Sequence, residues 1–244
     1  MRLCSAVCGL CLLSLPLEFT ACKKDSLWCS TAYWLTESAG KYGTLVIIVI
    51  AGFLYTLRIG SKREKIKTFF RPVIALLIIL SVFAFVNEHA TKKILKYARP
   101  SHLYVISQSG QQVDLVAMYK LETEQRQKFL QGLINNSPAL TNSIDKKVLD
   151  HWVEEAGYSF PSGHSFNAFL LACILSFSIY HSRYKKIFFV PFVWALFIAV
   201  SRVAIGAHSA LDVSVGAALG ILIAILFLYF DTTKNIFIRK KPAA

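Results

Sequence analysis

The sequence predicts an all-α integral membrane protein, a polytopic bundle of about six transmembrane helices. Hydrophobic residues make up 55% of the chain and its mean hydropathy is +0.50, which is more apolar surface than one soluble core of 244 residues requires. Several uncharged runs also approach the roughly 20 residues that a helix needs to cross a bilayer. The expected spans are residues 44–59, 72–87, 165–181, 187–204 and 212–230.

A further candidate span lies at the N-terminus. Arg2 precedes an apolar run from Leu3 to Leu17, and this pattern fits either a short first membrane helix or the hydrophobic region of a signal peptide. The residues before Cys22 approximate a lipoprotein cleavage site, but Phe19 stands where an aliphatic residue is usual. A retained helix and a cleaved leader are both compatible with these residues.

Basic residues gather in the short connections between spans and predict the orientation of the chain. By the positive-inside rule these connections lie in the cytoplasm, so the opposite ends of the same spans face outward. Such anchors, together with contact with anionic headgroups, also explain the net charge of +13, and nucleic-acid binding is not expected. The clusters comprise Arg58, Lys62, Arg63, Lys65, Lys67 and Arg71, then Arg183, Lys185 and Lys186, and then Lys234, Arg239, Lys240 and Lys241.

Three sequence blocks stand at the outward ends of these spans, and their residue types fit a phosphate-transfer site. Cationic side chains can bind a phosphoryl dianion, histidines can act as nucleophile and as acid or base, and a glycine at a helix start can form an anion cradle with its neighbours. The blocks are Lys92 with Arg99 and Pro100, then Pro161-Ser162-Gly163-His164, and then Ser201-Arg202 with His208 and Asp212.

The same residues also bear on metal binding. His208 and Asp212 are four residues apart, a spacing that could contribute to a zinc site. Three converging cations, however, would repel a metal ion and attract an anion. We therefore expect no metal and no other cofactor, with Lys92, Arg99 and Arg202 binding phosphate beside Ser162 and Gly163.

The three blocks resemble the pattern of the type 2 phosphatidic acid phosphatase superfamily, which is Lys-x6-Arg-Pro, Pro-Ser-Gly-His and Ser-Arg-x5-His-x3-Asp. Every fixed position is present here. The resemblance implies six spans, which favours a retained N-terminal helix, and a bacterial inner membrane with the site on its periplasmic face. It also implies that His208 attacks phosphorus, that Asp212 orients His208, and that His164 protonates the leaving oxygen and then activates water.

The resemblance further implies a substrate class. The expected activity is phosphatase action on phosphatidylglycerophosphate, undecaprenyl pyrophosphate or related lipids within the bilayer, and no obligate protein partner is evident in the sequence. Three alternatives remain compatible with the same residues: a lipid phosphotransferase, a lipid A phosphatase, and a membrane protein that binds lipid phosphates without turnover.

Residues 101–160 interrupt the membrane pattern with a polar, partly helical insertion on the external side, which includes a helix-like run from Leu121 to Leu133. This insertion could be a solvated cap or a lid that selects headgroups. We expect residues 1–244 to form one domain that carries it. Cys22 and Cys29 fall on the same side, where a disulfide is chemically permitted but not required. The other histidines, His89, His102, His151 and His181, are expected to be structural.

Overall fold

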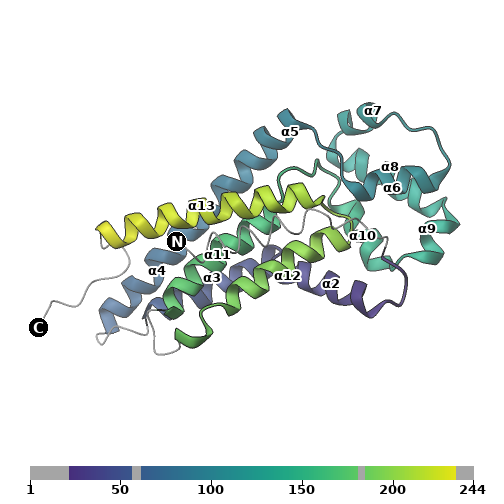
Figure 1. Ribbon diagram of the computed structural model, residues 1–244. Helices are drawn as coiled ribbons and strands as arrows, with labels where there is room; N and C mark the ends of the chain where they lie inside the picture. The colour runs from purple at the N-terminus through teal and green to yellow at the C-terminus, as the bar shows by residue number, and fades with distance from the viewer. Residues whose placement is uncertain (1–21, 57–61, 181–184, 235–244) are drawn as a thin grey trace, which may run out of the picture.

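The computed structural model describes residues 22–56, 62–180 and 185–234, which form a helical bundle with further helices at one end, and the all-α class is confirmed (Figure 1). Among these residues, four helical stretches are long and apolar enough to cross a membrane, namely Lys62–Leu95, Gly163–Tyr180, Lys185–Ala204 and Ala210–Phe230. The helices α2 (Leu27–Ser38) and α3 (Lys41–Thr56) meet at a bend of 56° and add a fifth span if they are counted together. The protein is thus an integral membrane protein. The expected N-terminal span, Leu3–Leu17, lies outside the described residues.

Helix α11 (Gly163–Tyr180) forms the centre of the bundle. It contains no Asp, Glu, Lys or Arg, and a helix that is apolar on all sides is stable only when its neighbours cover it. Those neighbours are α3, α12 (Val190–Ala204) and α13 (Ala210–Lys234). Helix α13 approaches very closely, because a Cβ atom built on Gly216 would lie 2.3 Å from the carbonyl oxygen of Ser162. The second turn of α13 is therefore pressed against the turn that leads into α11.

Helix α4 (Lys62–Val86) is longer than the expected span 72–87. It continues through a π-helix at Asn87–Thr91 into α5 (Lys92–Leu95), which gives a helical stretch of 34 residues. The extension has a simple cause, since lysine, arginine and glutamate are good helix formers and prolong the helix beyond its apolar part. Consequently Lys92 lies on the same continuous helical rod, Lys62–Leu95, as the membrane span, and not in a connection that follows the span.

The insertion folds into five helices: α6 (Pro100–Ser109), α7 (Leu115–Lys120), α8 (Thr123–Asn135), α9 (Pro138–Ser143) and α10 (Lys146–Glu154). Helix α8 corresponds to the predicted helix-like run. Buried apolar side chains from these helices, such as Val105, Leu130 and Trp152, share one cluster with Ile205 in the loop after α12. The indole N–H of Trp152 also donates to the carbonyl oxygen of Ile205 at 2.6 Å. The insertion is therefore packed against the loop that leads to His208.

A disulfide closes the segment at the start of α2, and the backbone of this segment contacts the insertion. Cys22 and Cys29 are bonded, with their Cα atoms 5.4 Å apart. The backbone N–H of Lys24 donates to the carbonyl oxygen of Ser143 at 2.7 Å, next to a β-bridge between Lys23 and Ile144. The question that the sequence left open is thus answered in favour of the bond.

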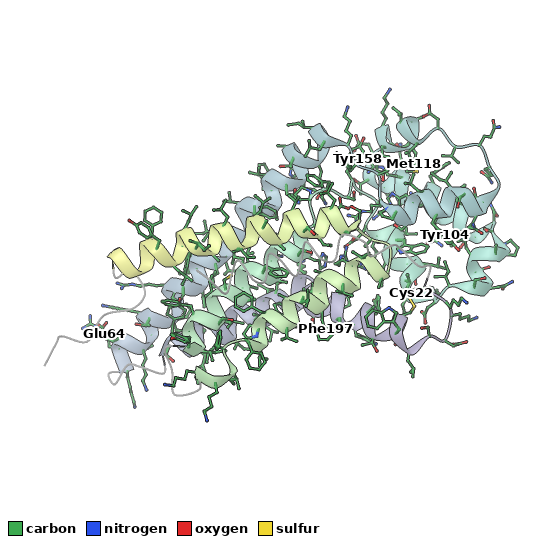
Figure 2. All side chains as sticks on the ribbon, in the orientation of Figure 1. Cys22, Glu64, Tyr104, Met118, Tyr158 and Phe197 are labelled. Atoms are coloured by element: carbon green, nitrogen blue, oxygen red, sulfur yellow. A yellow bond between two sulfur atoms is a disulfide. The ribbon has the colours of Figure 1, made fainter. Side chains whose placement is uncertain are left out.

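The basic start of α4 lies at the end of the bundle away from the insertion. The beginning of α4, with Lys62 and Arg63, and the far end of α13 lie opposite the insertion (Figure 1). Figure 2 shows the same separation, with Glu64 at one end and Tyr158 and Met118 at the other. The second block begins α11, the third joins α12 to α13, and Lys92 follows α4 and the π-helix. All three blocks lie at the end of the bundle beside the insertion.

Candidate active site

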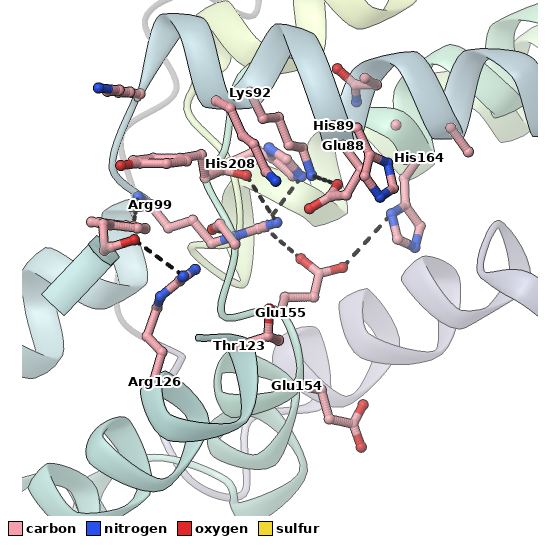
Figure 3. Close-up of a pocket in the computed structure, with 18 of the residues that line it drawn as sticks. Glu88, His89, Lys92, Arg99, Thr123, Arg126, Glu154, Glu155, His164 and His208 are labelled. Carbon is pink, nitrogen blue, oxygen red and sulfur yellow. Dashed lines mark hydrogen bonds and ion pairs between the residues drawn. The ribbon is translucent and has the colours of Figure 1, made fainter. Parts of the chain in front are cut away.

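The motif residues converge on one pocket of about 740 Å³ between the bundle and the insertion (Figure 3). Five of the eight predicted site residues line this pocket directly, namely Lys92, Arg99, Gly163, His164 and His208. The other three, Ser162, Arg202 and Asp212, are buried and contact the groups that line it. The structure therefore brings together every residue that the sequence singled out, although they are spread over more than a hundred positions of the chain.

The π-helix determines which way Lys92 faces. Its wider turn is closed by a hydrogen bond from the N–H of Lys92 to the carbonyl oxygen of Asn87, five residues earlier. A regular α-helix turns about 100° per residue, so the same sequence without the wide turn would point Lys92 away from the pocket. In the observed position, Lys92 Nζ lies 2.7 Å from Glu88 Oε2, and its side chain is only 10% exposed. The Asn87 amide also donates to the carbonyl oxygen of Pro161 at 3.3 Å, which joins the rod to the second motif block.

Arg99 is held by the loops on both sides of the site. Its Nε donates to the carbonyl oxygen of Gly157 at 2.9 Å, and its Nη1 donates to the carbonyl oxygen of Ala207 at 2.8 Å. The same Nη1 lies 3.4 Å from His208 Nε2. A guanidinium fixed in this way needs no reorientation before it binds an anion, which is the arrangement that favours phosphoryl groups.

The second block forms the turn into α11. The backbone N–H of Ser162 donates to the carbonyl oxygen of Asp212 at 3.0 Å, so the second and third blocks are joined through their backbones. Gly163 is the first residue of α11 and lines the pocket, where the free N–H groups of a helix start can receive an anion. His164 follows, with Nδ1 3.8 Å from Glu155 Oε1.

His208 and Asp212 form the predicted pair. Asp212 Oδ2 lies 3.4 Å from His208 Nδ1 and accepts a hydrogen bond from the N–H of Ser209 at 2.8 Å. Burial lowers the pKa of His208 to about 3, and Arg99 and Arg202 add to this shift against the opposing effect of Asp212. The imidazole is therefore neutral at physiological pH. With Nδ1 directed at the carboxylate, Nε2 keeps a lone pair that faces the pocket.

Glu155 also lines the pocket, and the sequence analysis did not single it out. Its Oε2 accepts from Arg99 Nη1 at 2.6 Å, as Figure 3 shows. The same oxygen accepts from Arg202 Nη2, so one carboxylate oxygen bridges both arginines. Burial would raise the pKa of Glu155, but Arg202 and Arg99 hold it well below its usual value. The available signal was the acidic pair Glu154-Glu155, six residues before the Pro-Ser-Gly-His block.

His102 provides a pH prediction outside the pocket itself. Its Nδ1 is hydrogen-bonded to the hydroxyl of Tyr119 at 2.7 Å, and that hydroxyl accepts from the backbone N–H of Arg99 at 3.1 Å. Burial, with a further contribution from Arg99, lowers the pKa of His102 to about 3. An unfolded histidine titrates near pH 6.5, so the stability gained by keeping His102 neutral is complete above that pH and is lost as the pH falls towards 3.

We therefore expect the unfolding temperature in detergent to fall between pH 7 and pH 4.5, and to fall less steeply in His102→Gln. The variant should keep part of the pH dependence, because the buried imidazoles of His151 and His208 also have lowered pKa values. Thermal unfolding at several pH values tests this. An unchanged pH slope in the variant would contradict a neutral, buried His102.

The site is rich in cations, and no group of three or more His, Cys, Asp or Glu side chains among residues 22–56, 62–180 and 185–234 is arranged to hold a metal ion. The independence from metals expected from the sequence stays a prediction. Of the remaining histidines, His89 lines the pocket, His151 contacts Arg202, and His181 lies outside the described residues.

Comparison with known proteins agrees with this geometry. Phosphatidylglycerophosphatase B of Bacillus subtilis is 32% identical over 108 residues, which cover 37% of this chain and 53% of that protein. The protein of the same name from Escherichia coli is 25% identical over 179 residues, covering 72% and 66%. The one from Haemophilus influenzae is 28% identical over 214 residues, covering 85% and 84%. The chain thus spans 53% and 66% of the first two relatives.

A family model also matches this chain. The model of the PAP2 superfamily matches residues 71–236, more than half of the chain. The matched region starts within α4, ahead of Lys92, and ends beyond Asp212, so it contains all three motif blocks and the insertion between them. It confirms the resemblance that the motifs alone suggested, and the chain belongs to the PAP2 superfamily.

Proposed function

We propose that this protein is a lipid phosphate phosphatase that works through a phosphohistidine on His208. The observation that carries the proposal is the bridging of Arg99 and Arg202 by one anionic oxygen, within a pocket that His164 and His208 also line. A site that binds a carboxylate between two arginines can bind a phosphoryl group there. The names of the relatives, phosphatidylglycerophosphatase B, suggest phosphatidylglycerophosphate among the substrates.

The reaction would proceed in two steps. In the first, His208 Nε2 attacks phosphorus, the bond from phosphorus to the leaving oxygen breaks, and a protonated His164 gives its proton to that oxygen. In the second, His164 takes a proton from water, the water oxygen attacks phosphorus, and the nitrogen–phosphorus bond breaks to release inorganic phosphate. Asp212 keeps the proton of His208 on Nδ1 throughout, while Lys92, Arg99 and Arg202 stabilise the charge on the equatorial oxygens.

The walls of the pocket suggest how a lipid would be placed. One part is lined by membrane helices, with Phe83 and Ala84 from α4 and Asn167 from α11. The other part is lined by residues of the insertion, including Thr123 and Tyr158. Acyl or prenyl chains would lie towards the first part and the polar group towards the second. Glu155 would leave the two arginines when the phosphoryl group arrives.

The direct test is release of inorganic phosphate by the purified protein in detergent micelles. Phosphatidylglycerophosphate, undecaprenyl pyrophosphate and phosphatidic acid should be compared, each with and without EDTA. We expect release that EDTA does not reduce, because the mechanism uses cationic side chains in place of a metal. Binding without release would favour a lipid-phosphate-binding protein, and transfer to an added sugar or lipid acceptor in preference to water would favour a phosphotransferase.

The placement of the site on the periplasmic face of a bacterial inner membrane is part of the same proposal. It is supported by the basic residues at the end of the bundle opposite the pocket. A cysteine introduced at the exposed position Gln111 should react with a membrane-impermeant thiol reagent in intact cells, and one at Lys65 should not. Both variants require a background without the native cysteines. The opposite labelling pattern would show that the site faces the cytoplasm and would contradict the proposed orientation.

A further inference from the structure

Helix α10 brings two acceptors to Arg202, and only one of them is Glu155. Arg202 lies on α12 and its side chain is fully buried. Its Nη2 donates to Glu155, whereas its Nη1 lies 2.9 Å from His151 Nε2. His151 and Glu155 are four residues apart, one helical turn, so the end of α10 presents both groups to the same guanidinium.

The chemistry of this contact specifies the state of His151. A guanidinium has only donors, so His151 Nε2 must carry a lone pair and the ring proton must be on Nδ1. Burial lowers the pKa of His151 to about 4, and Arg202 adds to the shift against the effect of Glu155, which agrees with a neutral ring. Nδ1 lies 3.8 Å from Glu37 Oε1 on α2 and Nε2 lies 3.5 Å from Glu155 Oε1, so the shorter contact with Arg202 at 2.9 Å determines the tautomer.

The surroundings of His151 fix its position. Its side chain is 6% exposed, and the edge of its ring meets Tyr33 of α2 with centroids 6.1 Å apart. Helix α2 also reaches α12 directly, because the hydroxyls of Thr36 and Ser201 are 2.9 Å apart, next to Arg202. His151 is thus held between α2 and α12, in contact with a site cation but outside the pocket lining.

The two acceptors differ in what happens when an anion enters. Glu155 lines the pocket and competes with the incoming phosphoryl group for Arg202 Nη2. His151 is neutral and bonds to the other nitrogen, so the anion does not compete with it. We propose that His151 is a positioning residue that holds Arg202 by Nη1 while the phosphoryl group replaces Glu155 at Nη2. This inference rests on the proposed phosphatase function.

Substitutions at His151 can test the contact because asparagine and glutamine mimic different ring nitrogens. The amide oxygen of glutamine can reach the position of Nε2, whereas that of asparagine is too short and falls near Nδ1. We expect His151→Ala and His151→Asn to weaken binding of inorganic phosphate, measured by titration calorimetry, by about ten- to hundredfold, the usual effect of a lost hydrogen bond to a charged group. His151→Gln should retain most of the binding. Equal losses in the Asn and Gln variants, or unchanged binding in both, would overturn the proposal.

A double-mutant cycle provides the second test, with phosphate release from phosphatidylglycerophosphate as the measurement. If His151 acts through Arg202, His151→Asn should reduce kcat/KM about ten- to hundredfold in the native background but much less in Arg202→Lys, where the fork geometry is already lost. Additive losses would show that His151 does not act through Arg202. Each variant should first be checked for a native-like unfolding temperature.

The two measurements separate this inference from the function on which it rests. If the protein binds phosphate with the expected His151 pattern but releases none from any lipid, the proposed function fails and the positioning role stands. If the native protein binds no phosphate, the positioning role fails as stated. If it hydrolyses lipids but the cycle is additive, the function stands and His151 is structural.

Discussion

Replacing His208 by alanine is expected to abolish turnover of every lipid phosphate, because no phosphohistidine can then form. Loss of a catalytic nucleophile typically reduces kcat by about four to six orders of magnitude, so residual activity should be near background. The fold should survive, since the side chain becomes smaller at a position that lines a pocket rather than the apolar core. Covalent labelling with a radioactive phosphate on the substrate tests the assignment. A phosphoenzyme in His208→Ala would show that another group attacks.

His164→Ala should behave differently, and its effect should depend on the leaving group. The alkoxide that leaves from phosphatidic acid needs a proton, whereas the phosphate that leaves from undecaprenyl pyrophosphate is much less basic and needs less help. The burst of first product should therefore fall less for the pyrophosphate. Steady turnover should fall for both lipids, because water activation is also lost. Equal losses in the burst would contradict the assignment of His164 as the acid.

Gly216→Ala is expected to reduce activity by about a hundredfold although Gly216 is not a site residue. The added Cβ would lie 2.3 Å from the carbonyl oxygen of Ser162, and both groups belong to helical or turn backbone that cannot rotate away. The turn that carries Gly163 and His164 would have to shift by roughly 1 Å, a displacement that costs catalysis about 10²-fold. The expected result is lower kcat with a reduced unfolding temperature.

The matched control is Gly132→Ala in α8. No atom lies within 4 Å of a Cβ at that position, and alanine favours a helix over glycine by about 0.5–1 kcal/mol. This variant should be fully active and slightly more stable. If Gly216→Ala matched it in both measurements, the close approach of α13 to the second block would not matter for the site.

The three motif blocks could be identified from sequence because their spacing is local and their chemistry is specific. Lys92, Arg99 and His164 were also placed on one side by the charge pattern of the connections, which depends on composition rather than on packing. Glu155 was not predicted, since a glutamate in a polar insertion is most often solvated. Its role depends on contacts with Arg99 and Arg202, which are 56 and 47 residues away.

The contact of His151 with Arg202 could not be predicted from the sequence either. It was expected to be a structural histidine, and it is indeed buried and hydrogen-bonded, but its partner is a cation of the site. No sequence period connects α10 with α12, so only tertiary packing shows the contact. The disulfide between Cys22 and Cys29 was undecided for a similar reason, because two cysteines in a polar segment do not specify how the backbone between them folds.

The π-helix at Asn87–Thr91 has a consequence for how this protein could change in evolution. The wide turn holds one more residue than a turn of α-helix. The segments before and after it therefore face the same directions as they would in a regular helix that is one residue shorter. Deleting one residue within Asn87–Thr91 would restore a regular helix and leave Lys92 facing the pocket. A deletion in a regular turn of α4 would instead rotate the two segments relative to each other by about 100°. The π-helix is therefore a point where the rod can tolerate a change of length, with its lipid-facing and phosphate-facing surfaces both preserved.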